Sequence, residues 1–345
     1  MRETYLRKKV EFPSGSEPIL SIRGLQTFFR TAQGVVRAVD GVSLDVMPGE
    51  CLGVVGESGS GKSVTFASVM GLIGKPGWIE GGEILYGGRD LTRLRPREMR
   101  RLRGSHIAMT MQDALTALNP ALTIGGQIVE VIMTHATDLP SGCAAETEAY
   151  WRAGQILRLV GIPAAGERLE EYPHQFSGGM RQRIMIAIAL ACQPQLLIAD
   201  EPTTALDVTI QAQVLELIAD IRRRLGMSVV LITHDLGVVA EYCERVVVMY
   251  AGQIVEMGPT REVISRPRHP YTEGLLASIP DPADPGKTIR PIPGQVPELV
   301  DLPPQCRFYS RCANRNDACL RDIDIRPVGD GRAARCVLAG KELRP

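Results

Sequence analysis

Eight residues near the start of the chain limit its possible folds more than any other stretch. Gly56 to Ser63, GESGSGKS, match the pattern G-x-x-x-x-G-K-[ST]. The apolar run CLGVV precedes them, and the helix-forming run VTFASVMGLIG follows. A strand, a glycine-rich loop and a helix in this order open a parallel α/β core. Glycines let successive N–H groups turn toward phosphate oxygens, so the sequence predicts an α/β fold that binds a nucleotide.

The motif also assigns roles within the loop. Lys62 is expected to reach the β- and γ-phosphates, and Ser63 is expected to ligate Mg²⁺. The residues expected to bind ATP here are Gly56, Ser58, Gly59, Ser60, Gly61, Lys62, Ser63 and Val64. By itself, this motif predicts nucleotide binding only.

Two adjacent carboxylates follow a later apolar run. In LLIADEP, Asp200 and Glu201 come at the carboxyl end of a predicted buried strand, where ligands collect in open α/β sheets. Phosphoryl transfer needs positioning and charge neutralisation more than covalent chemistry. One carboxylate is therefore expected to hold Mg²⁺, and the next to polarise the attacking water. This assigns Mg²⁺ binding to Asp200 and catalysis to Glu201.

The segment FSGGMRQR, residues 176–183, adds a second glycine-rich helix start. Ser177 is expected to cap a helix whose first N–H groups form another anion site. The segment resembles the signature of ABC ATPases, and Met180 in place of the usual Gln resembles the peptide-importer branch. This resemblance implies two cassettes arranged head to tail. Ser177, Gly178 and Gly179 would then act in trans on nucleotide bound by the partner.

The resemblance extends to four further positions. Gln112 matches the Q-loop, which senses Mg²⁺ and water, and His234 matches the switch histidine that contacts the γ-phosphate, so both are expected to act in catalysis. Residues 205–207, Ala-Leu-Asp, match the D-loop, with Asp207 as its acidic residue. Phe29 aligns with the aromatic residue that stacks on adenine, although Phe28 is its neighbour.

The family pattern also divides the chain. Residues 19–265 are predicted to form an ABC cassette with a RecA-like parallel-sheet core. Alternating runs at 19–27 and 35–46 predict an N-terminal antiparallel β subdomain, and helix-forming sequence predicts a helical insertion at about 113–176. Residues 266–345 form a predicted C-terminal extension. Its beginning, RPRHPYTEGLLASIP, resembles the segment that follows the cassette in the dipeptide, oligopeptide and nickel importer family.

Prolines and cysteines characterise this extension. The prolines that follow Ser278 predict a stiff linker and a separate appendage: Pro280, Pro282, Pro285, Pro291, Pro293, Pro297, Pro303 and Pro304. The appendage would carry four cysteines, Cys306, Cys312, Cys319 and Cys336. Four thiols suit zinc or an iron–sulfur cluster, and metal-free thiols or disulfides are a third possibility. Resemblance to the cysteine motif of peptide-importer ATPases favours a [4Fe–4S] cluster.

Charge and hydropathy restrict where the protein acts. The 39 Lys and Arg residues equal the 39 Asp and Glu residues, so no excess positive charge indicates a nucleic-acid partner. The start, MRETYLRKKVEF, lacks the apolar stretch of a secretory signal. The longest apolar run, residues 184–192, has about half of the roughly 18 residues that span a bilayer. The expected location is therefore peripheral, on the cytoplasmic face of the bacterial inner membrane.

The resemblance implies an ATPase subunit that drives an importer of peptides or related solutes. Its expected partners are a second, homologous ATP-binding subunit, two transmembrane permease subunits and, indirectly, an external solute-binding protein. A heterodimer of ATPases is favoured over a homodimer. The alternative is a soluble ABC ATPase of DNA repair or chromosome maintenance, which would require long heptad arms or a DNA-binding insertion. The roughly 60 residues between Gln112 and Ser177 show no sustained heptads.

Overall fold

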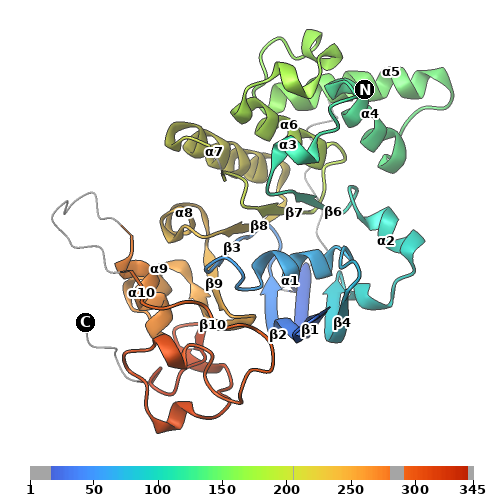
Figure 1. Ribbon diagram of the computed structural model, residues 1–345. Coiled ribbons are helices and arrows are strands. Elements are labelled where there is room, and N and C mark those ends of the chain that lie inside the picture. The colour runs from blue at the N-terminus through green and yellow to red at the C-terminus, as the bar shows by residue number, and fades with distance from the viewer. Residues whose placement is uncertain (1–16, 205, 280–290, 341–345) are drawn as a thin grey trace. The chain divides into compact units, whose positions relative to one another are not determined.

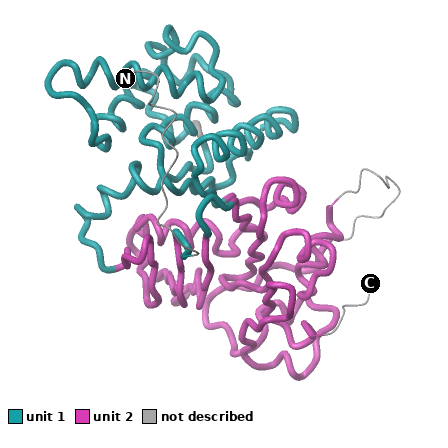
Figure 2. Tube along the Cα trace, turned by 180° about the vertical axis from the view of Figure 1, so that it is seen from behind, with its two compact units in different colours: residues 1–19, 47–50, 93–230 teal, residues 20–46, 51–92, 231–345 magenta. Residues whose placement is uncertain are grey.

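The computed structural model describes residues 17–204, 206–279 and 291–340, which form two compact units (Figures 1 and 2). The first unit comprises residues 1–19, 47–50 and 93–230. The second comprises residues 20–46, 51–92 and 231–345. The chain therefore passes between the units several times.

An antiparallel sheet begins the second unit. Its strand order is β2-β1-β4-β5, with β1 at Leu20–Thr31, β2 at Gly34–Val46, β4 at Gly77–Tyr86 and β5 at Arg89–Asp90. Leu20 pairs with Val46 on one side of β1 and with Tyr86 on the other. In β2, the alternate residues Val42, Leu44 and Val46 are buried, as a half-buried strand requires. This confirms the predicted N-terminal antiparallel β subdomain.

Parallel pairing in the second unit joins β3 (Cys51–Val55) to β9 (Arg245–Tyr250). Five of the six residues of β9 and every residue of β3 are buried, which explains their continuous apolar sequences. The antiparallel neighbour of β9 is β10 (Gln253–Pro259).

Residues 291–340, here called the C-terminal segment, continue this sheet. Strand β12 (Arg332–Ala334) pairs with β10, and β11 (Arg326–Gly329) pairs with β12. Val300 also forms a bridge with Val36 of β2. The prediction of a separate appendage is therefore wrong, because backbone hydrogen bonds join this segment to two sheets of the same unit. Pro280, Pro282 and Pro285 of the predicted linker lie outside the described residues.

The helices of the second unit are short. They are α1 (Lys62–Val69), α8 (Leu236–Tyr242), α9 (Thr260–Ser265), α10 (Pro270–Ala277), and the 3₁₀ helices η5 (Tyr309–Arg311) and η6 (Asp317–Cys319). His269 precedes α10 and is buried. Its Nδ1 accepts a hydrogen bond from the Tyr271 backbone N–H at 3.0 Å, which caps the helix. Burial, with a smaller contribution from Arg335, lowers the pKa of His269 from 6.5 to about 3.

This histidine predicts acid sensitivity of the second unit. The unfolded chain binds a proton at His269 below about pH 6.5, whereas the folded chain resists protonation down to about pH 3, so stability falls as pH decreases through this window. His269→Asn keeps a helix-capping acceptor that does not titrate. Between pH 7 and pH 5, the free energy of unfolding of the wild type should fall by about 2 kcal/mol more than that of the variant. Urea unfolding at both pH values measures this, and equal losses would contradict it.

Helices dominate the first unit, where α4, α5 and α6 pack together. Its helices are α2 (Pro96–Leu102), α3 (Ala114–Ala117), α4 (Ile124–His135), α5 (Cys143–Leu159), η3 (Glu167–Glu170), η4 (Pro173–Gln175), α6 (Gly178–Leu190) and α7 (Val208–Leu225). Parallel strands β6 (Ile107–Thr110) and β7 (Leu196–Asp200) accompany them. All regular elements described between residues 113 and 176 are helical, as the sequence indicated.

Two elements cross from one unit to the other, η2 (Leu91–Arg93) and β8 (Ser228–Thr233). Every residue of β8 is buried, as its run SVVLIT predicts. Among the described residues, none of the helices has the length and apolar character needed to span a membrane.

Candidate functional site

The predicted phosphate loop, residues 56–63, is a tight turn between β3 and α1 that requires glycine at two positions. Gly56 has φ +155°, and a Cβ there would lie 2.2 Å from the carbonyl oxygen of Met249. Gly61 has φ +98°, and a Cβ there would lie 2.4 Å from the carbonyl oxygen of Ala38. Only glycine fits either position, because backbone atoms of neighbouring strands cannot move aside.

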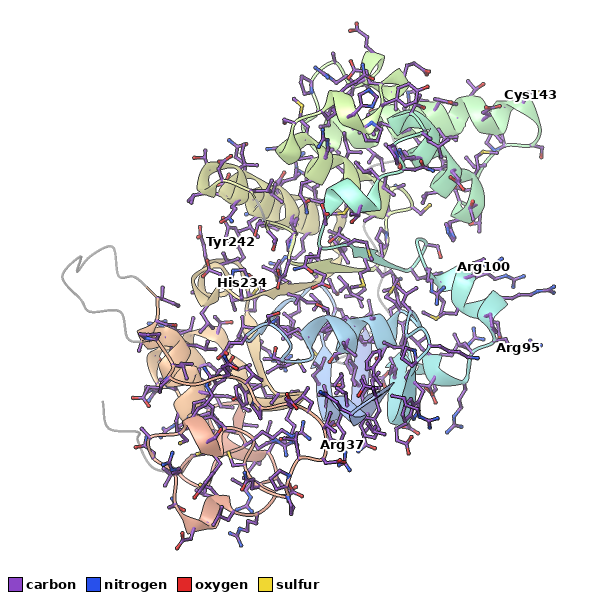
Figure 3. The ribbon with its side chains drawn as sticks, in the orientation of Figure 1. Arg37, Arg95, Arg100, Cys143, His234 and Tyr242 are labelled. Carbon is purple, nitrogen blue, oxygen red and sulfur yellow. The ribbon has the colours of Figure 1, made fainter. Side chains whose placement is uncertain are left out.

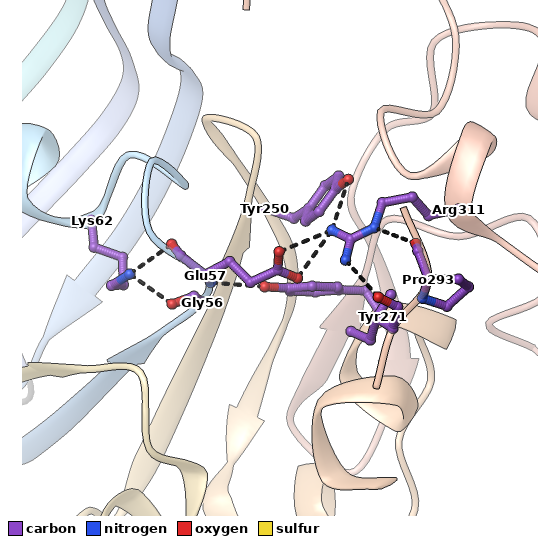
Figure 4. A network of polar contacts seen from close by, with 8 residues as sticks. Gly56, Glu57, Lys62, Tyr250, Tyr271, Pro293 and Arg311 are labelled. Carbon is purple, nitrogen blue, oxygen red and sulfur yellow. Dashed lines mark hydrogen bonds and ion pairs between the residues drawn. The ribbon is translucent and has the colours of Figure 1, made fainter. Parts of the chain in front are cut away.

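Lys62 is the first residue of α1, and it is 5% exposed. Its ammonium donates to the carbonyl oxygens of Gly56 at 2.7 Å and Glu57 at 2.9 Å (Figure 4). It also donates to Ser60 Oγ at 3.3 Å. The positive charge is thereby fixed against the loop that the sequence assigns to phosphate.

The other residues predicted to bind ATP differ in exposure. Ser58, Gly59 and Ser63 are exposed, Val64 is half-buried, and Ser60 is buried. The exposed backbone N–H groups at the start of α1 suit an anionic ligand. The exposed hydroxyl groups there suit coordination of a Mg²⁺ ion that keeps several of its water molecules.

Phe29 lies in β1 of the same unit and is half-buried. Its ring covers Gly77, where a Cβ would lie 2.5 Å from Phe29 Cε1. The neighbouring Phe28 contacts Trp78 edge to face, with ring centroids 6.2 Å apart, and the Arg37 guanidinium lies 5.7 Å from its centroid. The two phenylalanines thus have different neighbours: the Phe29 ring lies over Gly77, whereas the Phe28 ring contacts the side chains of Trp78 and Arg37.

In the first unit, the structure brings together two predicted catalytic residues. Glu201 Oε2 accepts hydrogen bonds from Gln112 Nε2 at 2.9 Å and from Thr204 Oγ1 at 2.8 Å. Glu201 has φ +45°, a left-handed conformation that is uncommon for residues other than glycine. Asp200, at the end of β7, is 6% exposed. A half-buried carboxylate held by two donors can orient a water molecule.

The signature residues form a capped helix start, also in the first unit. Ser177 Oγ accepts from the Met180 backbone N–H at 3.4 Å at the beginning of α6. A Cβ on Gly179 would lie 2.7 Å from Ile210 Cγ2, so glycine permits α6 to approach α7 closely. Asp207 caps α7, accepting from the Ile210 N–H at 2.9 Å. Ala205 of the D-loop pattern lies outside the described residues.

His234 follows β8 directly and is exposed (Figure 3). It belongs to the second unit with Phe29 and the phosphate loop, whereas Gln112, Glu201 and the signature belong to the first. The next residue, Asp235, caps α8 by accepting from the Gly237 N–H at 2.7 Å. His234 therefore lies in a short turn between a buried strand and a helix.

The prediction of a [4Fe–4S] cluster is wrong. Although Cys306, Cys312, Cys319 and Cys336 all lie in the C-terminal segment, no group of three or more His, Cys, Asp or Glu residues in the described ranges could hold a metal ion. Burial raises the pKa of the Cys306 and Cys312 thiols, and raises that of Cys336 to about 11. The neighbouring cysteines add to each of these increases.

Two sets of contacts at the site were not predicted from the sequence. Thr204 lies one turn after Glu201, and this spacing could have indicated its hydrogen bond. In the second unit, Arg311 forms an ion pair with Glu57 of the phosphate loop (Figure 4). These two residues are 254 positions apart, and no sequence pattern connects them.

Family comparisons match two parts of the chain. Residues 39–204 match the ABC transporter family, and residues 255–319 match the oligopeptide/dipeptide transporter C-terminal region. The second match begins in β10 and includes α9, α10, η5 and η6.

A curated relative covers most of the chain. The dipeptide transport ATP-binding protein DppD of Bacillus subtilis is 52% identical over 308 residues, covering 88% of this chain and 90% of the relative. Among solved structures, the ATP-binding cassette MJ0796, a dimer in a post-hydrolysis state bound to ADP and phosphate, is 26% identical with a TM-score of 0.62. That match covers 70% of this chain and 99% of the cassette. CbiO1 of Clostridium perfringens, part of the ABC transporter complex cbiONQ, is 26% identical with a TM-score of 0.61, covering 72% of this chain and 91% of CbiO1.

Proposed function

Because the chain belongs to the family of ABC transporter ATP-binding proteins, we propose that it is the ATP-hydrolysing subunit of an importer of dipeptides or oligopeptides. The observation that carries this proposal is the 52% identity to a dipeptide transport ATP-binding protein across 88% of the chain. The match of residues 255–319 to the peptide-transporter C-terminal region also supports it. Transport would occur through permease subunits in the membrane, with this chain at their cytoplasmic face.

The phosphate loop binds ATP in this proposal. Lys62 exchanges its loop carbonyls for β- and γ-phosphate oxygens, and the N–H groups at Gly59 to Ser63 take the remaining phosphate charge. Ser63, Gln112 and Asp200 are the residues assigned to Mg²⁺, and a bound Mg²⁺ ion would neutralise developing charge on the phosphates. Phe29 stacks on adenine.

Hydrolysis is assigned to Glu201, whose carboxylate orients water for in-line attack on the γ-phosphate. Its hydrogen bonds from Gln112 and Thr204 fix the carboxylate so that little reorganisation is needed. His234 contacts the γ-phosphate and completes the catalytic set. We assign these steps to residues 19–265, with the helical insertion at about 113–176 and the C-terminal extension at 266–345.

A second cassette completes each site. MJ0796, which shares the fold, is a dimer in its ADP-bound structure. Ser177, Gly178 and Gly179 lie at a helix start whose N–H groups suit an anion, and they are assigned to the nucleotide of the partner. A homologous ATP-binding subunit is the proposed partner, and an external solute-binding protein delivers peptide to the permeases.

Action in trans predicts a distinctive phenotype for Ser177→Asp. Aspartate is as good a helix cap as serine, so α6 should remain folded. Its charge should repel the partner's γ-phosphate and lower the ATPase rate of the assembled pair by about tenfold or more. ATP affinity of the mutated chain alone should stay within about twofold of the wild type. Equilibrium ATP titration and steady-state hydrolysis measure both quantities, and a weakened affinity of the isolated chain would indicate action in cis.

Growth on peptides tests the proposed function. A strain that lacks this gene and requires an amino acid should fail to grow when that amino acid is supplied as a dipeptide, but should grow on the free amino acid. The wild-type gene should restore growth, and Glu201→Gln should not. The alternative of a DNA-repair ATPase is disfavoured by the transport relative and by the C-terminal family match. Normal growth on dipeptides together with sensitivity to DNA damage would favour that alternative.

A further inference from the structure

The C-terminal segment contacts the phosphate loop through a buried arginine. Arg311 ends η5, and its side chain is 5% exposed. Its Nη1 lies 3.0 Å from each carboxylate oxygen of Glu57, the second residue of the loop (Figure 4). A charged group so deeply buried is expected to be paired. The pairing partner here is a loop residue.

Glu57 is held by two further contacts. Its backbone N–H donates to Tyr271 Oη at 2.9 Å, and its carbonyl oxygen accepts from Lys62 Nζ at 2.9 Å. Tyr271 is fully buried in the first turn of α10, within the region that matches the peptide-transporter C-terminal family. The backbone N–H, the carbonyl oxygen and the carboxylate of Glu57 are therefore all held by hydrogen bonds. Two of these groups, the N–H and the carboxylate, are held by residues that follow the cassette.

Arg311 is itself rigidly placed. Nε donates to the Pro293 carbonyl oxygen at 2.9 Å, and Nη2 donates to that of Ile292 at 3.3 Å. The guanidinium carbon lies 5.7 Å from the ring centroid of Tyr250 and 5.9 Å from that of Phe308. These contacts fix the guanidinium on several sides, so it supplies a positive charge at a set position beside Glu57.

The charge of Glu57 explains why such fixing matters. The Glu57 side chain is 30% exposed, and its carboxylate belongs to the loop assigned to the phosphates of ATP. An unpaired carboxylate there would repel those phosphates and could turn toward Lys62, whereas an ion pair with Arg311 removes both effects.

We propose that Arg311 and Tyr271 are positioning residues for ATP binding. They hold Glu57 in place and neutralise its carboxylate, so the C-terminal segment forms part of the support of the nucleotide site. This inference rests on the proposed assignment of residues 56–63 to the phosphates of ATP.

The test is a double-mutant cycle on ATP affinity, measured with the full chain by equilibrium titration. Arg311→Ala should weaken ATP binding by about tenfold, because it leaves a loop carboxylate unpaired. Glu57→Gln removes that charge and should change the affinity by less than about threefold. In the Glu57→Gln background, Arg311→Ala should then have an effect below about threefold, because no charge remains to be neutralised. In the assembled transporter, Arg311→Ala should raise the KM for ATP and leave kcat within about twofold.

Two control variants separate positioning from folding. Arg332 is also a buried arginine of the C-terminal segment, but it bonds to Asp330 at 3.0 Å and to the Arg266 carbonyl oxygen at 2.7 Å. Arg332→Ala should lower the melting temperature and leave ATP affinity within about twofold. If Arg311→Ala does not fold, Tyr271→Phe tests the same support, since it removes only the acceptor of the Glu57 N–H and should weaken ATP binding by about threefold.

Two results distinguish failure of this inference from failure of the proposed site. If Lys62→Ala weakens ATP binding while Arg311→Ala, or Tyr271→Phe in its place, binds like the wild type, the positioning role is overturned and the site stands. A defect of Arg311→Ala that Glu57→Gln does not relieve also overturns the role. Wild-type affinity in Lys62→Ala would instead overturn the assignment of ATP to this loop.

Discussion

Glu201→Gln is expected to lower ATP hydrolysis by the assembled transporter about 100- to 1,000-fold while ATP affinity stays within about twofold. Glutamine has nearly the same shape, and its amide oxygen can still accept hydrogen bonds from Gln112 and Thr204. The amide lacks the negative charge that is assigned to orienting and polarising the attacking water. ATP should therefore bind and remain intact, and dimers of the cassette should accumulate in the ATP-bound state.

Steady-state phosphate release, ATP titration and size-exclusion chromatography with ATP measure these three effects. Glu216→Gln is the matched control. Glu216 is exposed on α7 of the same unit, and its substitution removes the same negative charge. The control should retain wild-type hydrolysis. Turnover by Glu201→Gln within about threefold of the wild type would show that another group orients the water.

Lys62→Ala is expected to weaken ATP binding itself, by about 10- to 100-fold. The ammonium is buried and already directed at the loop by the carbonyl oxygens of Gly56 and Glu57. Its removal deletes the one cationic side chain of the loop and leaves those two carbonyls without this donor. Lys75→Ala removes an exposed lysine of the same unit and should bind ATP like the wild type.

Equilibrium titration with a fluorescent ATP analogue provides the measurement, and competition by unlabelled ATP corrects for the label. Circular dichroism of both variants checks that α1 and its neighbours stay folded. Equal affinities of Lys62→Ala and Lys75→Ala would contradict the phosphate role of Lys62.

The parallel strands of the core were predictable because a strand that is buried on both faces has a continuous apolar sequence. The continuous apolar runs at 51–55, 228–233 and 245–250 coincide with β3, β8 and β9. Strand β4 was not predicted, because Gly77, Gly81 and Gly82 interrupt its pattern. Gly82 has φ +93° near a register shift in its pairing with β1. Such an irregularity depends on the partner strand, which local sequence does not reveal.

Contacts between residues far apart in the sequence were harder still to predict. The prolines after Ser278 indicated a linker, yet β12 pairs with β10 and joins the C-terminal segment to a core sheet. Resemblance to the cysteine motif of peptide-importer ATPases implied an iron–sulfur cluster, but no metal-binding arrangement occurs in the described part of the chain. Local motifs predict roles for Lys62 and Glu201, since each motif contains its own strand and turn. The contact between Arg311 and Glu57 depends on tertiary packing across 254 positions.

ATP-driven peptide uptake measures the central claim most directly. The chain would be reconstituted in proteoliposomes with its permease subunits, its companion ATPase and the solute-binding protein, and a labelled dipeptide would be followed into the lumen. Wild-type chain with ATP should support uptake, whereas Glu201→Gln, Lys62→Ala and wild type without ATP should not. ATP hydrolysis that proceeds without any uptake of dipeptides or oligopeptides, and without stimulation by them, would contradict a role in peptide import.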